Sequence, residues 1–127
     1  MVRPDPARPE APARFGRANR LVRGWQFQRA FREGKSERGE CVVAYAHTAP
    51  GEPSRLGIIA SRKVGNAVLR NRAKRRLREV ARALWPRVPA DGRQVVLIAL
   101  SVVPTVDFGR LADDVARLLR NLGVLES

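Results

Sequence analysis

The sequence predicts an α+β fold in which helices pack on a small sheet to form a two-layer sandwich. Short β-rich runs alternate with amphipathic helical stretches, which is the first reason for this prediction. The second is that 44% of the 127 residues are apolar, enough for one modest core. A third observation concerns function: the net charge of +13 implies a salt-sensitive attraction to phosphate backbones.

The N-terminal part is predicted to contain a tail and one short helix. Residues 1–14 include four prolines and show no periodicity, so we expect a disordered tail before a single domain at 15–127. Apolar residues fall on one face of a helix from Gly24 to Arg32. Stronger capping residues than Gly24 and Gln26 are common at such a start, so we expect this helix to begin loosely.

Two strands are predicted in the middle of the chain. β-Branched and aromatic residues favour a strand from Cys41 to Thr48, followed by an Ala-Pro-Gly turn at 49–51. A second strand is expected over 55–61, antiparallel to the first through that turn. Cys41 and His47 are separated by an even number of positions, so both would face the same side of the strand. Two such residues do not complete a metal site, and we interpret His47 as a strand histidine with satisfied hydrogen bonds.

A long basic helix is predicted between Asn66, a good N-cap, and the Trp85-Pro86 pair. Nine of the 21 residues from 62 to 82 are Arg or Lys and one is acidic, which gives this segment a balance of +8. Its apolar residues recur at helical spacing and would face the core: Leu69, Ala73, Leu77, Val80, Ala81 and Leu84. A helix that presents an arginine-rich outer face is suited to bind a polyanion, so we infer a nucleic-acid-binding protein.

The C-terminal part is predicted to contain an apolar central strand over 94–103 and a helix from Asp107 to Leu122. Asp113 and Asp114 diverge by about 100° on this helix and would not converge on one metal ion. No serine or cysteine has a general base that the sequence places beside it. The single cysteine favours a reducing, cytoplasmic location, and the longest apolar run is too short to span a bilayer.

The segment from Ser61 to Glu79, SRKVGNAVLRNRAKRRLRE, resembles the signature of the bacterial ribonuclease P protein subunit. That family's pattern is roughly S-[KR]-K-x-G-N-A-V-x-R-N-R-x-K-R-x-[LIV]-R-E. The phenylalanines at 27 and 31, the Gly-Lys pair at 34–35 and the tyrosine at 45 fit the family as well. The resemblance covers about residues 20–119.

The resemblance implies a fold and a function that the bare sequence does not. The basic helix would lie in a left-handed β-α-β crossover over a small mixed sheet, as in domain 2 of a small-subunit ribosomal protein. The chain would act with a catalytic RNA, its partner and cofactor, to remove the 5′ leader of precursor tRNA. Mg²⁺ would be held mainly by that RNA, and the protein alone would be inactive. Neither a membrane nor a small-molecule substrate is expected as a partner.

The resemblance also implies two sets of binding residues and no catalytic or metal-binding residue in the protein. The catalytic RNA would be bound by Arg62, Lys63, Asn66, Arg70, Asn71, Arg72, Lys74, Arg75 and Arg78. The leader would be bound by Arg20, Arg23, Phe27, Phe31, Lys35 and Tyr45. From the sequence alone, core packing of the aromatic residues remains an alternative to a leader cleft, and Trp25 is open to surface stacking or packing.

Two other functions fit parts of the sequence. A non-enzymatic ribosomal or rRNA-binding protein of similar fold would show the same basic helix. A helix-turn-helix DNA-binding protein would need a second helix just before the basic one, whereas residues 55–61 favour a strand there. The aromatic residues together with the Gly-Asn-Ala-Val spacing favour the ribonuclease P function.

Overall fold

The computed structural model describes residues 15–126, which contain three α-helices and four strands. The predicted tail at 1–14 lies outside this part of the chain. The elements in chain order are α1 Gly24–Glu33, β1 Lys35–Arg38, β2 Val42–Pro53, β3 Arg55–Ile59, α2 Ala67–Leu84, β4 Asp91–Ala99 and α3 Phe108–Asn121. No helix among these residues has the length and apolar character needed to cross a bilayer.

All six predicted elements are present, and the structure adds one strand. β1 is a polar four-residue edge strand, and its sequence Lys-Ser-Glu-Arg has none of the apolar alternation that predicts a strand. The turn predicted at 49–51 is wrong, because these residues lie within β2. The pairing of β2 with β4 shifts its register there, between Thr48 and Pro53, and the chain reverses only after Pro53.

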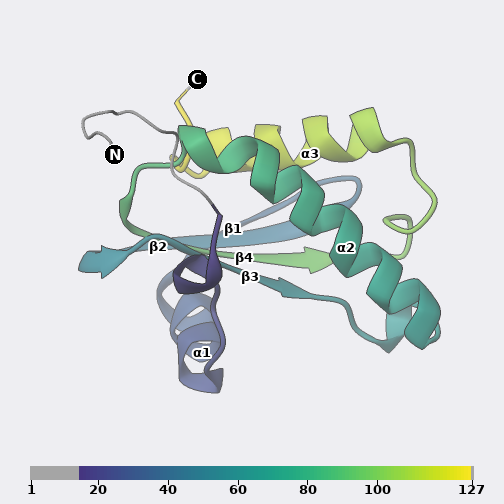
Figure 1. Ribbon diagram of the computed structural model, residues 1–127, viewed down its shortest axis with the longest axis horizontal. Helices are drawn as coiled ribbons and strands as arrows, with labels where there is room; N and C mark the ends of the chain where they lie inside the picture. The colour runs from purple at the N-terminus through teal and green to yellow at the C-terminus, as the bar shows by residue number, and fades with distance from the viewer. Residues whose placement is uncertain (1–14, 127) are drawn as a thin grey trace, which may run out of the picture.

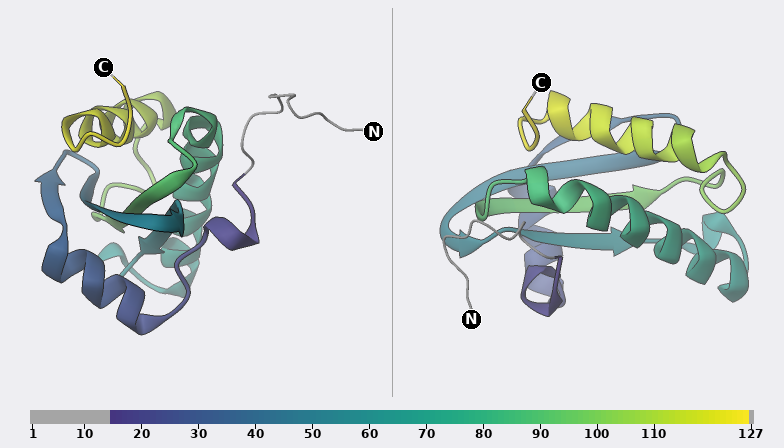
Figure 2. Two further views of the ribbon diagram at one scale, coloured as in Figure 1. Left: turned by 90° about the vertical axis from the view of Figure 1, so that its left-hand side faces the viewer. Right: turned by 45° about the horizontal axis from the view of Figure 1, so that its top comes forward.

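The four strands form one mixed sheet in the order β1-β2-β4-β3. β4 pairs antiparallel with β2 and parallel with β3. The second strand of the sequence prediction therefore runs antiparallel to the first, but β4 is inserted between them. The right-hand view of Figure 2 shows α2 in front of the sheet, with β3 and β4 pointing the same way and β4 above β3. This crossover is left-handed, as the resemblance implied, against the usual rule.

The helices cover the two faces of the sheet unequally. α2 and α3 lie together on one face and bury the main core, and α1 crosses the other face (Figure 1). Even-numbered residues of β2, such as Ala44, face the main core, whereas Tyr45 faces α1. Cys41 precedes β2 and is buried in the main core, so the prediction that it faces the same side as His47 is wrong.

Side-chain caps fix the starts of the helices. The Asn66 side chain accepts a hydrogen bond from the Leu69 N–H at 3.0 Å, which confirms the predicted start of α2. The predicted loose start of α1 is wrong, because Gln26 is buried there. Its side-chain oxygen accepts hydrogen bonds from the backbone N–H groups of Val22 and Arg23 at 2.9 and 3.0 Å, which fixes the chain just before the helix.

Candidate RNA-binding surface

The outer face of α2 is strongly basic because its apolar stripe faces the core. Ala73, Leu77 and Val80 are buried, and the residues between them point outward. Four predicted RNA-binding residues of the helix are exposed: Asn71, Arg72, Arg75 and Arg78. Two more, Arg70 and Lys74, are half-buried. The only carboxylate on this helix is that of Glu79, which pairs with Arg82 near its C-terminal end.

A basic turn precedes α2 and extends the same surface. Arg62 and Lys63 are exposed in a 3-10 turn that starts at Ser61, whose hydroxyl accepts from the Lys63 N–H at 3.3 Å. Gly65 then takes a φ of 140°, in the region that favours glycine, and its carbonyl accepts from Arg70 at 3.2 Å. The turn therefore places these two cations beside the N-terminus of α2, where no acidic side chain offsets the positive end of the helix dipole.

Arg76 differs from the other basic residues of α2 in having a structural role. Its guanidinium donates to the carbonyls of Val103 and Val106, both at 2.6 Å, and lies over the Phe108 ring. It thereby ties α2 to the loop between β4 and α3. The sequence does not distinguish Arg76 from its exposed neighbours, because the carbonyls that it binds lie about 30 residues away in the chain.

The aromatic residues of α1 and β2 meet on the other face of the sheet. The Phe31 and Tyr45 rings pack edge to face with their centroids 5.0 Å apart. Phe27 covers Gly57 of β3 so closely that a Cβ at position 57 would lie 2.5 Å from its ring. All three rings are only partly buried, as are Ile59 and Ile98 beside them. We call these five residues the aromatic face; they combine core packing with an accessible apolar surface.

The aromatic face and the basic helix approach each other at the outer edge of β3, where Arg20 forms a bridge to Leu56. A small pocket of about 100 Å³ is lined there by Arg20, Phe27, Gly57 and Arg78, among others. Arg20 also lies over the ring of Phe15, 5.8 Å from its centroid. The structure therefore brings together Arg20 and Phe27 from the predicted leader set with Arg78 from the predicted catalytic-RNA set.

Two other predicted leader-binding residues lie apart from this pocket. Arg23 is exposed at the start of α1. Lys35 pairs with Ala46 at the start of β1 and lines a different cavity, of about 380 Å³, together with residues 122–124, which follow α3. The structure thus places Lys35 in a cavity next to the segment after α3, which neither Phe27 nor Phe31 lines.

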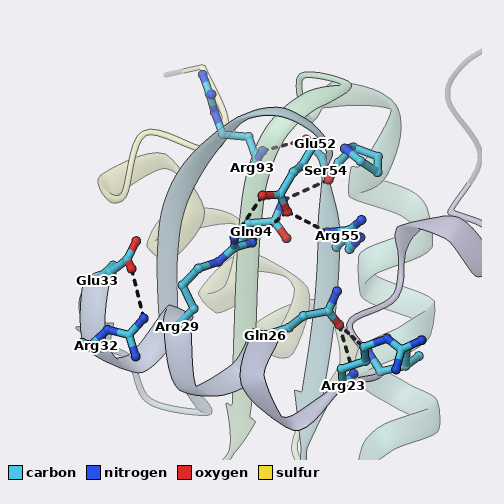
Figure 3. A network of polar contacts seen from close by, with 12 residues as sticks. Arg23, Gln26, Arg29, Arg32, Glu33, Glu52, Ser54, Arg55, Arg93 and Gln94 are labelled. Carbon is cyan, nitrogen blue, oxygen red and sulfur yellow. Dashed lines mark hydrogen bonds and ion pairs between the residues drawn. The ribbon is translucent and has the colours of Figure 1, made fainter.

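A charge cluster that the sequence did not predict holds α1 against the sheet (Figure 3). Arg29 donates two hydrogen bonds to the carboxylate of Glu52, at 2.9 and 2.8 Å, and Arg55 adds a third at 3.0 Å. The hydrogen bonds from Arg29 are the main cause that lowers the pKa of Glu52 to about 2, with a further contribution from Arg55. The cluster fixes the position of α1, and with it the aromatic face.

We expect this cluster to make the free energy of unfolding fall in acid. The pKa of Glu52 is about 2 in the folded chain against an ordinary 4.5, so the unfolded chain takes up a proton first. The stabilisation is therefore complete above pH 4.5 and lost as the pH falls through 2. Urea unfolding should be measured from neutral pH into this range. The free energy of unfolding should fall more steeply with decreasing pH for the wild type than for Glu52→Gln. Glu33→Gln, which removes an exposed carboxylate of α1, should behave like the wild type; equal curves for all three would contradict the prediction.

Among the remaining polar groups, the buried carboxylate of Asp114 has a structural role. Asp114 is buried on α3 and accepts from the backbone N–H groups of Glu40 and Cys41 at 3.1 and 2.9 Å.

Burial raises the pKa of the Cys41 thiol and lowers that of His47. Neither ring nitrogen of His47 has a hydrogen-bond partner among residues 15–126, so the predicted satisfied histidine is wrong. The same residues contain no group of three or more His, Cys, Asp or Glu side chains placed to hold a metal ion.

Comparisons with known proteins agree with this geometry. A family model described as Ribonuclease P matches residues 15–123. The chain is 40% identical over 111 residues to the ribonuclease P protein component of Symbiobacterium thermophilum, which covers 87% of this chain and 96% of that protein. It is 36% identical over 118 residues to that of Thermus thermophilus, over 93% of this chain and 68% of that one.

Solved structures are similar as well. The RNase P protein of Staphylococcus aureus matches with a TM-score of 0.75 at 28% identity, over 85% of this chain and 98% of that chain. The RNase P protein of Thermotoga maritima matches with a TM-score of 0.70 at 34% identity, over 80% of this chain and 96% of that chain.

Proposed function

The chain belongs to the ribonuclease P protein family, and we propose that it binds ribonuclease P RNA through α2 while it holds the 5′ leader of precursor tRNA on the aromatic face. It is thus a component of bacterial ribonuclease P, an endoribonuclease that processes the 5′ end of tRNA. The observation on which the proposal rests is the pocket that Arg78 and Phe27 both line, because it connects the two surfaces. The family match does not favour the alternative of a non-enzymatic ribosomal protein.

The α2 surface supports the contact with ribonuclease P RNA by its charge and its rigidity. Each exposed arginine offers a planar set of donors that matches a phosphate, and neutralising a phosphate releases counterions. The stripe of buried residues that includes Leu77 fixes the helix on the core, so the guanidinium groups project from an ordered backbone. Arg62 and Lys63 would extend the contact past the helix N-terminus, and Asn71 would add an amide for a sugar or base edge.

The aromatic face supports the contact with the leader. A single strand exposes its bases, and bases stack on aromatic rings with little sequence preference. The partly buried rings of Phe27, Phe31 and Tyr45 offer such a surface beside the half-buried Ile59 and Ile98. Arg23 directly precedes α1 and Arg20 lies beside β3, and both would neutralise leader phosphates. This arrangement would hold a leader without selecting its sequence.

We propose that the RNA performs the chemistry and holds the Mg²⁺ ions, and that this chain contributes binding and charge. Enzyme RNA and precursor tRNA repel each other as polyanions, and a protein with a net charge of +13 between them lowers that repulsion. The carboxylates of Glu40, Glu52 and Asp114 are each paired with arginine, which supports a structural role for them. A cytoplasmic location is also proposed, with which the free, buried thiol of Cys41 is compatible.

Cleavage of 5′-labelled precursor tRNA at low Mg²⁺ tests this function. We expect the cognate RNA to cut at the mature 5′ end with the protein and poorly without it, whereas the protein alone is inactive. Phe31→Ala should weaken binding of the precursor about tenfold, because base-aromatic stacking contributes about 1–3 kcal/mol per base. Mature tRNA, which lacks the leader, should bind the wild-type and variant holoenzymes equally.

Phe108→Ala is the matched control, because Phe108 is a partly exposed aromatic residue on α3, at the other face of the sheet. Arg76, which lies over its ring, keeps its two hydrogen bonds to the carbonyls of Val103 and Val106 in this variant. It should keep the wild-type affinity for the precursor. If the wild-type protein bound the RNA but changed neither cleavage nor precursor affinity, the proposed function would be wrong.

A further inference from the structure

Trp25 is a large aromatic residue that the fold does not use in its core. It lies in the first turn of α1 and is 54% exposed, whereas the other tryptophan, Trp85, is only 4% exposed. Val22, just before the helix, is 73% exposed. Neither Val22 nor Trp25 belongs to the two apolar clusters formed by the described residues. The start of α1 therefore presents an accessible apolar surface.

The Trp25 ring is held in place by the charge cluster. The guanidinium carbon of Arg29 lies 5.1 Å from the centre of the ring, a cation-π contact. Arg29 is itself fixed by its two hydrogen bonds to Glu52, and its side chain is only 17% exposed. A ring that is already positioned loses little conformational entropy when a partner stacks on it. The exposed part of the indole ring is therefore already positioned to stack against a planar group.

The position of Trp25 on α1 relates it to the aromatic face. At about 100° per residue, Trp25 lies about 200° round the helix from Phe27. The two rings therefore project from opposite flanks of α1, near its N-terminal end. Arg23 is exposed just before the helix and forms no ion pair with another residue of the described part of the chain. A single strand that leaves the aromatic face round this end of α1 would pass Arg23 and reach Trp25.

The chemistry and the size of this surface favour a nucleotide over a protein partner. An aromatic side chain offers at most about 250 Å², whereas a stable protein interface buries about 1,200 Å² or more. The basic groups around the ring favour a phosphate-bearing partner, because both oxygens of the nearby Glu52 carboxylate already accept from arginines. A single nucleobase with its phosphate matches both the size and the charge.

We propose that Trp25 is a second stacking site for the precursor, which binds a leader nucleotide beyond those on the aromatic face. This inference rests on the proposed function and extends it, because the leader-binding surface would continue past the N-terminal end of α1. It predicts that the holoenzyme distinguishes precursors by the length of the leader, even where the added nucleotides lie far from the cleavage site. Arg29 would act as a positioning residue that keeps the indole ring in place.

A series of precursors whose leaders grow by one nucleotide at a time tests the proposal in the reconstituted holoenzyme. Trp25→Ala should bind short-leader precursors like the wild type and should lose about fivefold in affinity once the leader reaches the ring. Phe108→Ala should follow the wild type at every length. In a Trp85→Phe background, the fluorescence of Trp25 should be quenched by precursors above that length and not by shorter ones. Because Trp25 is exposed, its removal should leave the melting temperature close to that of the wild type.

The outcomes separate the two proposals. If the wild-type holoenzyme shows no leader-dependent affinity at all, the proposed function itself fails. If Phe31→Ala weakens binding but Trp25→Ala matches the wild type at every length, only the stacking site is overturned. A Trp25→Ala variant that instead abolishes self-association of the protein, with unchanged affinity for long leaders, would assign the surface to a second copy of the chain and would also overturn the site.

Discussion

Replacing Arg72 and Arg75 together by alanine is expected to weaken binding of ribonuclease P RNA about 100-fold. Both side chains are exposed on the outer face of α2, and each is expected to bind one phosphate with charge-assisted hydrogen bonds. A loss of about 1.4 kcal/mol of binding free energy at each arginine corresponds to a tenfold loss of affinity per residue. Counterion release also predicts that the slope of log affinity against log salt becomes shallower by about 1.5. Filter binding or fluorescence anisotropy over a salt series measures both quantities.

The matched control removes two arginines from elsewhere on the surface. Arg87 follows α2 in a 3-10 turn and Arg120 lies on α3, and both are exposed. The Arg87→Ala/Arg120→Ala variant has the same net charge as the test variant. We expect its affinity for the RNA to fall less than threefold, because it alters only the long-range electrostatic field. The change in its salt slope should be at most about half of the change in the test variant. Equal losses in the two double variants would show that α2 has no special part in binding.

The basic helix could be predicted from the sequence because its determinants are local. Asn66, the stripe that includes Leu77, and the Trp85-Pro86 stop all act within a few residues of the backbone that they shape. The same holds for the aromatic pair on α1, since Phe27 and Phe31 are one helical turn apart. Periodicity and capping therefore predicted which elements form and which residues they expose.

The arrangement of the strands could not be predicted in the same way. The insertion of β4 between β2 and β3 depends on pairing across long stretches of chain, and the left-handed crossover runs against the general rule. Only the resemblance to the family implied that handedness. Lys35 illustrates the consequence for the site: because β1 was not predicted, the side of the sheet that Lys35 faces was not predicted either.

Contacts between residues distant in sequence were also beyond prediction. Glu52 directly follows the predicted turn at 49–51, and its partner Arg29 lies 23 positions away. Asp114 looked like one of two adjacent helix carboxylates, yet it binds backbone groups 73 and 74 positions earlier. Charged residues resemble one another in a sequence of this composition, and the partners that the fold brings to them decide which become structural.

Asp114→Ala is accordingly expected to be among the most destabilising single substitutions. It leaves the N–H groups of Glu40 and Cys41 without acceptors, and a buried unsatisfied donor costs about 1–3 kcal/mol. It also removes the partner of Arg117, which is half-exposed and contributes little. We expect the free energy of unfolding to fall by about 3 kcal/mol and the melting temperature by roughly 10 °C. Urea denaturation and thermal melts measure the two changes.

Asp113→Ala is the control, because Asp113 is the exposed neighbour on the same helix and makes no side-chain hydrogen bond within the described residues. It should melt within about 2 °C of the wild type, since surface substitutions change stability little. Asp114→Asn keeps one carbonyl oxygen as an acceptor, so its melting temperature should lie between those of Asp114→Ala and Asp113→Ala. At temperatures where Asp114→Ala is still folded, it should bind ribonuclease P RNA as the wild type does, because α2 lies outside the contact that it loses. Similar melting of the two alanine variants would mean that the turn between β1 and β2 is fixed without Asp114.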